Sequence, residues 1–86
     1  MKFRRTARFE RAYAKLTAAH AARVIEAIDR FANDPTHPSL RVKRMQGTAN
    51  IWEARASNSL RLTFERDGDV VVLRNVGAHD ATLRRP

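Results

Sequence analysis

Residues 60–76, LRLTFERDGDVVVLRNV, decide the fold, because two stretches of alternating apolar and polar residues flank a turn signal. Alternation with a period of two is typical of β-strands that bury one face. We therefore expect strands at Leu60–Arg66 and Val70–Val76. The Asp67-Gly68 pair between them predicts a two-residue hairpin loop, since glycine accepts the positive φ of such a turn. In this register Arg61 lies opposite Arg74, on the face away from the core.

A strand is also predicted upstream, at Ile51–Ser57, and its register follows from the side chains that must share the core. Trp52 and Phe64 each belong to an apolar face, and the two faces meet only if the connecting loop has an odd number of residues. The natural choice pairs Trp52 with Phe64. That register places Arg55 directly opposite Arg61.

A fourth strand is predicted at Leu40–Gln46, joined to the next by a four-residue loop at Gly47–Asn50. This pairing places Met45 against Trp52 in the core and Arg44 opposite Glu53 on the outer face. Glu53 would then partly neutralise the arginines beside it.

Two amphipathic helices are predicted before these strands. The large apolar side chains of Phe9–Leu16 recur with the spacing of one helical face, and Thr17 is a plausible N-cap for a second helix. A stronger apolar stripe runs over Ala21–Ala32. It ends at Asn33-Asp34-Pro35, because proline disfavours helical geometry in the residue before it. Phe3 and its neighbours predict a short leading strand.

Together these elements predict one α+β domain that spans residues 1–86. An N-terminal αα-hairpin packs on one face of a twisted, mostly antiparallel sheet of three to five strands, in the order (β)ααβββ(β). Helices that are segregated in sequence from antiparallel strands favour this layered arrangement.

The composition points to a polyanionic partner or an acidic protein. The 86 residues include 17 Lys and Arg against 9 Asp and Glu, which gives a net charge of +8. Such a field attracts nucleic acids, although a basic but otherwise ordinary soluble protein has the same composition. The lack of cysteine excludes disulfides and thiolate metal sites. No apolar run is long enough for a membrane span, and no apolar core follows the basic N-terminus, so we expect a cytoplasmic protein.

The predicted registers place Arg55, Arg61 and Arg74 in a row on the face away from the helices. Like charges directly opposite each other destabilise a sheet, so the row points to an anion site, most naturally for phosphodiesters. The alternative is a solvated charged face that Glu53 and Glu65 relieve.

Of the three histidines, His79 has the position best suited to chemistry, because it follows the last strand near the arginine row. An imidazole there could transfer protons near neutral pH, or it could be an ordinary turn residue. His20 is expected at the surface or in a helix cap, and His37 in a structural linker. Their separation in sequence shows no metal-ligand spacing.

A series of short motifs follows one another along nearly the whole chain. They are Phe9–Leu16, Asn33-Asp34-Pro35, His37-Pro38-Ser39-Leu40, Lys43-Arg44-Met45-Gln46-Gly47, Trp52-Glu53-Ala54-Arg55, Leu60-Arg61-Leu62-Thr63-Phe64 and Val76-Gly77-Ala78-His79-Asp80. In their order and spacing they resemble the RelE/ParE superfamily of bacterial type II toxins.

The resemblance implies a metal-independent endoribonuclease without a cofactor, which cuts mRNA, often on the ribosome, and so inhibits translation. It assigns contact with the scissile phosphate to Arg61, a further cationic role to Arg55 and acid or base catalysis to His79. The RNA backbone would be held by Lys43, Arg44 and Arg74. A cognate antitoxin with a partly disordered acidic segment is the implied protein partner.

Two other functions stay open within this resemblance. ParE-like members share the fold but inhibit DNA gyrase, and a catalytically inactive basic relative would act only with its antitoxin. Many active members carry an aromatic residue shortly after the His79 position, whereas no aromatic residue follows Phe64 here. His79 favours the ribonuclease branch.

Overall fold

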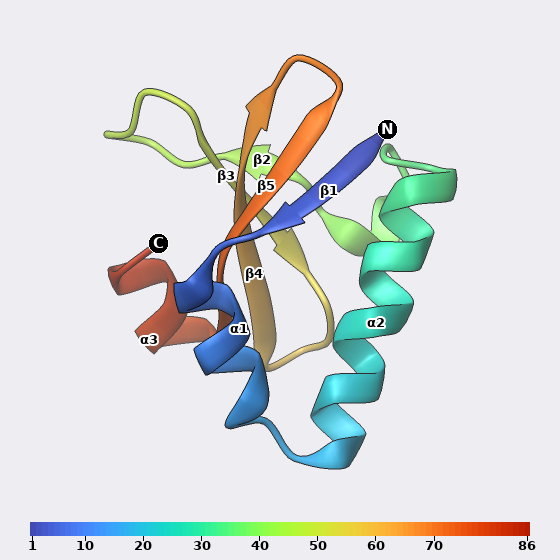
Figure 1. Ribbon diagram of the computed structural model, residues 1–86, viewed down its shortest axis with the longest axis vertical. Helices are drawn as coiled ribbons and strands as arrows, with labels where there is room; N and C mark the ends of the chain where they lie inside the picture. The colour runs from blue at the N-terminus through green and yellow to red at the C-terminus, as the bar shows by residue number, and fades with distance from the viewer.

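Five strands form one mixed sheet in the order β1-β5-β4-β3-β2, in a computed structural model that describes all residues 1–86 (Figure 1). Strand β1 pairs in parallel with β5, and the other neighbours are antiparallel. The elements in chain order are β1 (Lys2–Arg5), α1 (Ala7–Ala14), α2 (Ala18–Asn33), the 3-10 helix η1 (Pro38–Leu40), β2 (Lys43–Arg44), β3 (Ile51–Arg55), β4 (Leu60–Asp67), β5 (Val70–Ala78) and α3 (His79–Arg84). The predicted α+β class is confirmed. None of the helices is long and apolar enough to cross a membrane.

Threonine caps set the starts of both long helices. The Thr6 hydroxyl accepts a hydrogen bond from the Phe9 amide at 3.0 Å, and the Thr17 hydroxyl accepts one from the His20 amide at 3.1 Å. Each cap satisfies an amide that has no partner within its helix, which is worth about 1 kcal/mol. The predicted second helix start at Thr17 is therefore confirmed.

The core lies between one face of the sheet and the helices α1 and α2. Phe9, Phe31 and Phe64 are at most 4% exposed, and they meet side chains from β3 and β5 there. The Phe31 ring lies edge-on to Phe64, with centroids 5.1 Å apart, and the Trp52 ring stacks on Phe64 at 6.4 Å. Trp52 thus packs against the core. The predicted stripe on α2 is confirmed at Val24 and Phe31, but Ile25 is half-exposed and Ala27 is buried in its place.

The register between β3 and β4 is the predicted one. Trp52 lies opposite Phe64, and Arg55 lies opposite Arg61. The prediction succeeds because a slip of one residue would turn the apolar side chains of either strand toward solvent.

The register between β4 and β5 differs from the prediction. The two-residue loop is Gly68-Asp69 rather than Asp67-Gly68, with Gly68 at φ +59°. Glycine thus takes the first central position of the loop instead of the second, which is also a favoured hairpin arrangement. A β-bulge beside Thr63 and Phe64 then shifts the pairing again, so that Arg61 lies opposite Gly77. The predicted opposition of Arg61 and Arg74 is wrong.

The pairing between β2 and β3 also differs by one residue. Strand β2 is only two residues long, with Lys43 opposite Glu53 and Arg44 opposite Trp52. The predicted pairs of Met45 with Trp52 and of Arg44 with Glu53 are therefore wrong. The connection is longer than predicted, and within it the Thr48 hydroxyl donates to the Met45 carbonyl at 2.7 Å.

The sequence did not predict α3, a helix of six residues that covers part of the second face of the sheet. The Thr63 hydroxyl donates to the Pro86 carbonyl at 3.0 Å, and the Asn75 amide group donates to the Arg85 carbonyl at 3.0 Å. Thr82 is buried at 3% exposure. So short a segment with one large aliphatic side chain carries too little periodicity to be recognised as a helix.

Candidate functional site

Arg55 and Arg61 form the centre of the candidate site, at the end of β3 and the start of β4. One guanidinium nitrogen of Arg61 donates to the carbonyls of Ser57 at 2.8 Å and Leu60 at 3.0 Å. The Arg55 guanidinium donates to the side-chain oxygen of Asn58. The β3–β4 loop therefore holds both cations in place although they repel each other.

The guanidinium groups of Arg55 and Arg41 both act on Arg61 at this site. Partial burial, then the charge of Arg55, and to a smaller extent Arg41, lower the pKa of Arg61, while Glu53 acts in the opposite direction. An arginine keeps its charge at neutral pH even so. Binding an anion here relieves the repulsion, which makes the cluster suited to a phosphate group.

Arg41 is a member of this cluster that the sequence did not single out. It follows η1 with a left-handed backbone, at φ +46°, and its amide donates to the Pro38 carbonyl at 3.3 Å. It is the sole non-glycine residue with positive φ in the protein. Such a conformation costs on the order of 1 kcal/mol and is concentrated at functional sites. The sequence signal for it is weak, because nothing in the Pro38–Leu40 segment specifies the direction in which the chain leaves η1.

His79 lies beside the same loop. Its amide donates to the Ser59 carbonyl at 2.8 Å, and its Nδ1 lies 2.8 Å from a carboxylate oxygen of Asp80. This hydrogen bond, together with the imidazole charge, lowers the pKa of Asp80. The His79 side chain is half-exposed. The Ser57–Leu60 loop thus connects Arg61 and His79, while the imidazole itself is turned to Asp80.

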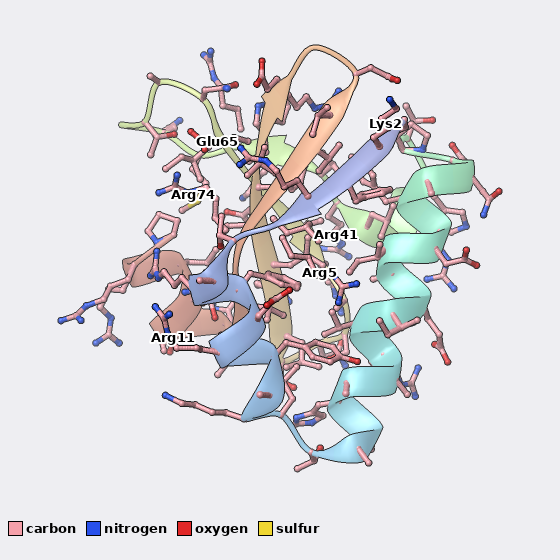
Figure 2. All side chains as sticks on the ribbon, viewed as in Figure 1. Lys2, Arg5, Arg11, Arg41, Glu65 and Arg74 are labelled. Carbon is pink, nitrogen blue, oxygen red and sulfur yellow. The ribbon has the colours of Figure 1, made fainter.

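The remaining basic residues of the predicted site are dispersed. Lys43 lies opposite Glu53 and so shares a sheet face with Arg55, whereas Arg44 lies opposite Trp52 on the other face. Arg74 pairs with Glu65 at 3.1 Å and donates from Nε to the Pro86 carbonyl at 3.2 Å (Figure 2). The predicted row of three arginines is reduced to Arg55 and Arg61, and Arg41 joins them from another segment.

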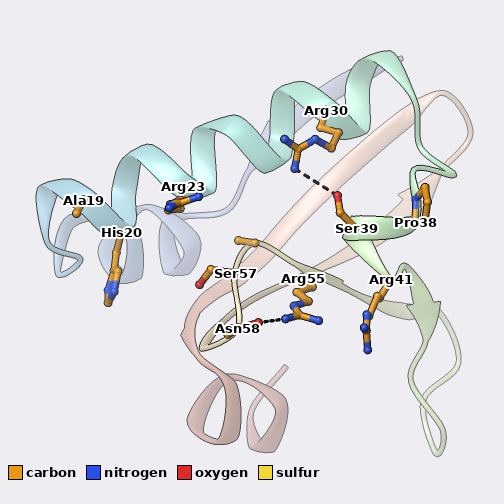
Figure 3. Close-up of a pocket in the computed structure, with 11 residues that line it drawn as sticks. Ala19, His20, Arg23, Arg30, Pro38, Ser39, Arg41, Arg55, Ser57 and Asn58 are labelled. Atoms are coloured by element: carbon orange, nitrogen blue, oxygen red, sulfur yellow. Dashed lines mark hydrogen bonds between the residues drawn. The ribbon is translucent and has the colours of Figure 1, made fainter.

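The other two histidines occupy different surroundings. His37 caps η1, where its Nδ1 accepts from the Ser39 amide at 3.2 Å, as the structural interpretation of this linker predicts. His20 lies in the first turn of α2, and its imidazole lines a groove that also contains Arg41 and Arg55 (Figure 3). No three carboxylate, imidazole or thiol groups lie close enough together to hold a metal ion.

The chain has the α+β fold of solved RelE, YoeB/ParE and YafQ structures, which is the fold that the resemblance of the sequence motifs implies. No protein-family model matches the sequence, and no curated protein matches it.

Three solved structures illustrate the likeness. A chain of the archaeal RelE–RelB complex from Pyrococcus horikoshii OT3 has a TM-score of 0.73 at 18% identity, over 92% of this chain and 94% of that chain. The YoeB/ParE toxin from Agrobacterium tumefaciens has a TM-score of 0.74 at 16% identity, over 92% of this chain and 99% of that chain. A chain of the E. coli DinJ–YafQ toxin–antitoxin complex has a TM-score of 0.77 at 10% identity, over 93% of each chain.

Proposed function

We propose that this protein is the toxin of a type II toxin–antitoxin module and that it cleaves RNA without a metal ion. The observation that carries the proposal is the Arg55–Arg61 pair, held by the β3–β4 loop to which the His79 amide is also bonded. The fold shared with RelE, YoeB and YafQ structures and the motif order support the same function.

In the proposed reaction the ribose 2′-hydroxyl attacks the adjacent phosphorus, and the bond to the departing 5′-oxygen breaks. The 2′-hydroxyl proton passes to a base, and the 5′-oxygen takes up a proton from an acid. Arg61 and Arg55 stabilise the charge that builds up on the phosphorane oxygens, because their donors are positioned before the reaction begins. Two guanidinium groups facing one phosphate provide the planar, bidentate contacts that phosphate oxygens favour.

His79 supplies one of the two proton transfers. Its Nδ1 faces the Asp80 carboxylate, which can only accept a hydrogen bond when ionised. The pairing therefore favours a proton on Nδ1 and leaves Nε2 available to the substrate, in the manner of a carboxylate-oriented catalytic histidine. Glu53, which is 9% exposed and whose charge raises the pKa of Arg61, is the carboxylate candidate for the second transfer.

Among the predicted RNA-binding residues, those on the Arg55 side of the sheet fit contacts beside the reacting phosphate. Lys43 fits this role because it shares that face. Arg44 and Arg74 fit it less well, since Arg44 lies on the opposite face and Arg74 is engaged by Glu65 and Pro86.

The proposed protein partner is a cognate antitoxin. The net charge of +8 suits an acidic, partly disordered segment that wraps the surface. The ribosome and mRNA are the proposed targets, and the cytoplasm is the corresponding location.

Controlled expression in a bacterial host, with transcriptome-wide mapping of RNA 5′ ends, tests the proposal. Wild type should arrest growth and create new mRNA ends, whereas Arg61→Ala and His79→Ala variants that remain folded by circular dichroism should not. Growth arrest with DNA damage and no new RNA ends would instead indicate the gyrase-inhibitor alternative. No arrest by the folded wild-type protein would indicate an inactive relative.

A further inference from the structure

An open groove of about 880 Å³ runs between α2, the η1 segment and the β3–β4 loop (Figure 3). Its basic side chains come from three parts of the chain that are distant in sequence. Arg23 and Arg30 belong to α2, Arg41 follows η1, and Arg55 ends β3. No acidic residue lines the groove.

The four arginines of this groove are not neutralised by the protein itself. None of them has a carboxylate within 4.0 Å, in contrast to Arg74, which pairs with Glu65. Arg30 donates only to the Ser39 hydroxyl at 3.3 Å, and Arg55 only to Asn58. Four unpaired cations facing one hollow repel one another, so the groove is complementary to an extended anion.

The four arginines Arg23, Arg30, Arg41 and Arg55 also follow one another along the groove, and we call this series the arginine track. Arg23 and Arg30 are seven residues apart on α2, which places them on one helix face about 10 Å apart along its axis. The charge of Arg41 lowers the pKa of Arg61, and Arg55 lies opposite Arg61 in the sheet. The track therefore ends at the candidate catalytic pair. Arg41, between the two ends of this track, has a left-handed backbone conformation that is energetically unfavourable for a non-glycine residue.

We propose that this groove binds the sugar–phosphate backbone of the substrate RNA beyond the scissile phosphate, from Arg41 toward Arg30 and Arg23 on α2. The inference rests on the proposed function and extends it, because it assigns the direction in which the strand leaves the Arg55–Arg61 pair. It also assigns a binding role to residues outside the predicted catalytic set.

The lining of the groove favours RNA backbone over a protein segment. A docked peptide needs apolar or aromatic pockets for its anchoring side chains, whereas the groove has no Phe, Tyr or Trp and its hydrophobic lining residues are the small Ala19 and Ala56. The groove has no Phe, Tyr or Trp side chain, the large rings on which bases usually stack, and the His20 imidazole is the one aromatic ring in its lining. Contacts to phosphates alone position a strand without reading its sequence, so binding here is independent of base identity.

The test measures binding of a fluorescent single-stranded RNA of about ten nucleotides, a length within the usual range of single-strand sites. Methylation of every 2′-oxygen prevents cleavage during the measurement. The groove variant is Arg23→Gln/Arg30→Gln, and the control variant Arg11→Gln/Lys15→Gln removes the same charge from the exposed surface of α1 and its C-terminus. Arg11 projects from α1 on the side away from α2 (Figure 2).

We expect the groove variant to bind about tenfold more weakly and to reduce the slope of log affinity against log salt by about 1.4, or about 0.7 per lost phosphate contact. The control variant should change both quantities much less. Equal losses of affinity and salt slope in the two variants would overturn the proposal that the groove binds RNA, whether or not wild type cleaves RNA. Binding of polyglutamate, but not of RNA, that depends on Arg23 and Arg30 would overturn it too, in favour of an acidic protein.

Cleavage assays separate this inference from the proposed function. If wild type cleaves RNA while the groove and control variants bind RNA equally well, the catalytic proposal stands and the proposed RNA binding in the groove is contradicted. If wild type leaves all RNA intact while the groove variant alone loses affinity and salt slope, the groove stands as an RNA site and the catalytic proposal fails.

Discussion

Arg55 and Arg61 face each other across β3 and β4, and both guanidinium groups donate hydrogen bonds into the loop that joins these strands. The pairing is electrostatically unfavourable, since like charges directly opposite each other destabilise a sheet. The loop offsets part of this cost, because Asn58 and the carbonyls of Ser57 and Leu60 serve as acceptors. The arrangement keeps two cations ready for an anion before any substrate arrives.

The first prediction concerns Arg61. Replacing it with Gln removes donors to two well-placed loop carbonyls and one of the two central cations. We expect RNA cleavage to fall by roughly a hundredfold to a thousandfold, as for loss of one transition-state donor. The free energy of unfolding should fall by only about 1–2 kcal/mol. Single-turnover cleavage and urea denaturation measure the two effects, and an Arg11→Gln variant that loses as much activity would contradict the assignment.

The second prediction separates function from stability at Arg41. Asparagine tolerates the left-handed backbone better than arginine does, so Arg41→Asn should leave the free energy of unfolding unchanged or raise it by up to about 0.5 kcal/mol. RNA affinity should nevertheless fall several-fold, because a groove cation is lost. Denaturation and fluorescence anisotropy on the same preparation decide the matter. Unchanged affinity would remove Arg41 from the binding surface.

The third prediction concerns the pH dependence of the His79–Asp80 pair. The hydrogen bond from His79 lowers the pKa of Asp80, so the carboxylate is favoured in the folded state. The resulting stabilisation is present above the usual pKa of an aspartate, about 3.9, and is lost as the pH falls through the lowered value in the folded protein. In His79→Ala the pKa of Asp80 should move up toward its usual value. A carboxyl carbon NMR titration that shows no such rise would exclude the pairing in solution.

The fourth prediction concerns the β4–β5 loop. Gly68 adopts φ +59° with open space around its Cα, so a substitution there costs only backbone strain. Gly68→Ala should lower the free energy of unfolding by about 1 kcal/mol, and Gly68→Asn by less, because asparagine enters this region more readily. Chemical denaturation of both variants gives the comparison. An equal loss of unfolding free energy in the two variants would indicate that residue 68 does not keep a positive φ in solution.

The fifth prediction tests the core. Phe64 is fully buried between Phe31 and Trp52, and truncation to alanine should cost about 3–5 kcal/mol. That is a large part of the stability of an ordinary domain, about 5–15 kcal/mol. Ile25→Ala is the matched surface control, because Ile25 is half-exposed and should cost far less. Thermal unfolding distinguishes the two, and similar shifts would contradict the packing described.

The success and failure of the registers have a common physical cause. The β3–β4 pairing was predictable because both strands bury one face, and only one alignment joins Trp52 to Phe64. The β4–β5 pairing was not, because Gly68 suits either central position of a two-residue loop, and the bulge near Thr63 leaves no mark in the hydrophobic pattern. A shift of this kind separated Arg74 from Arg61. The short helix α3 was missed because docking, rather than its own pattern, defines it.

Local chemistry in the chain was enough to establish the class of fold, the two helices with the cap at Thr17, and the opposition of Arg55 and Arg61, since each depends on spacing between near neighbours. Only the tertiary structure determines which other cationic side chains lie near that pair. Arg41 arrives through a left-handed turn after η1, and Arg23 and Arg30 arrive because α2 packs across the sheet. These positions depend on contacts between segments far apart in sequence, and an isolated arginine carries no periodic signal of where such packing will place it.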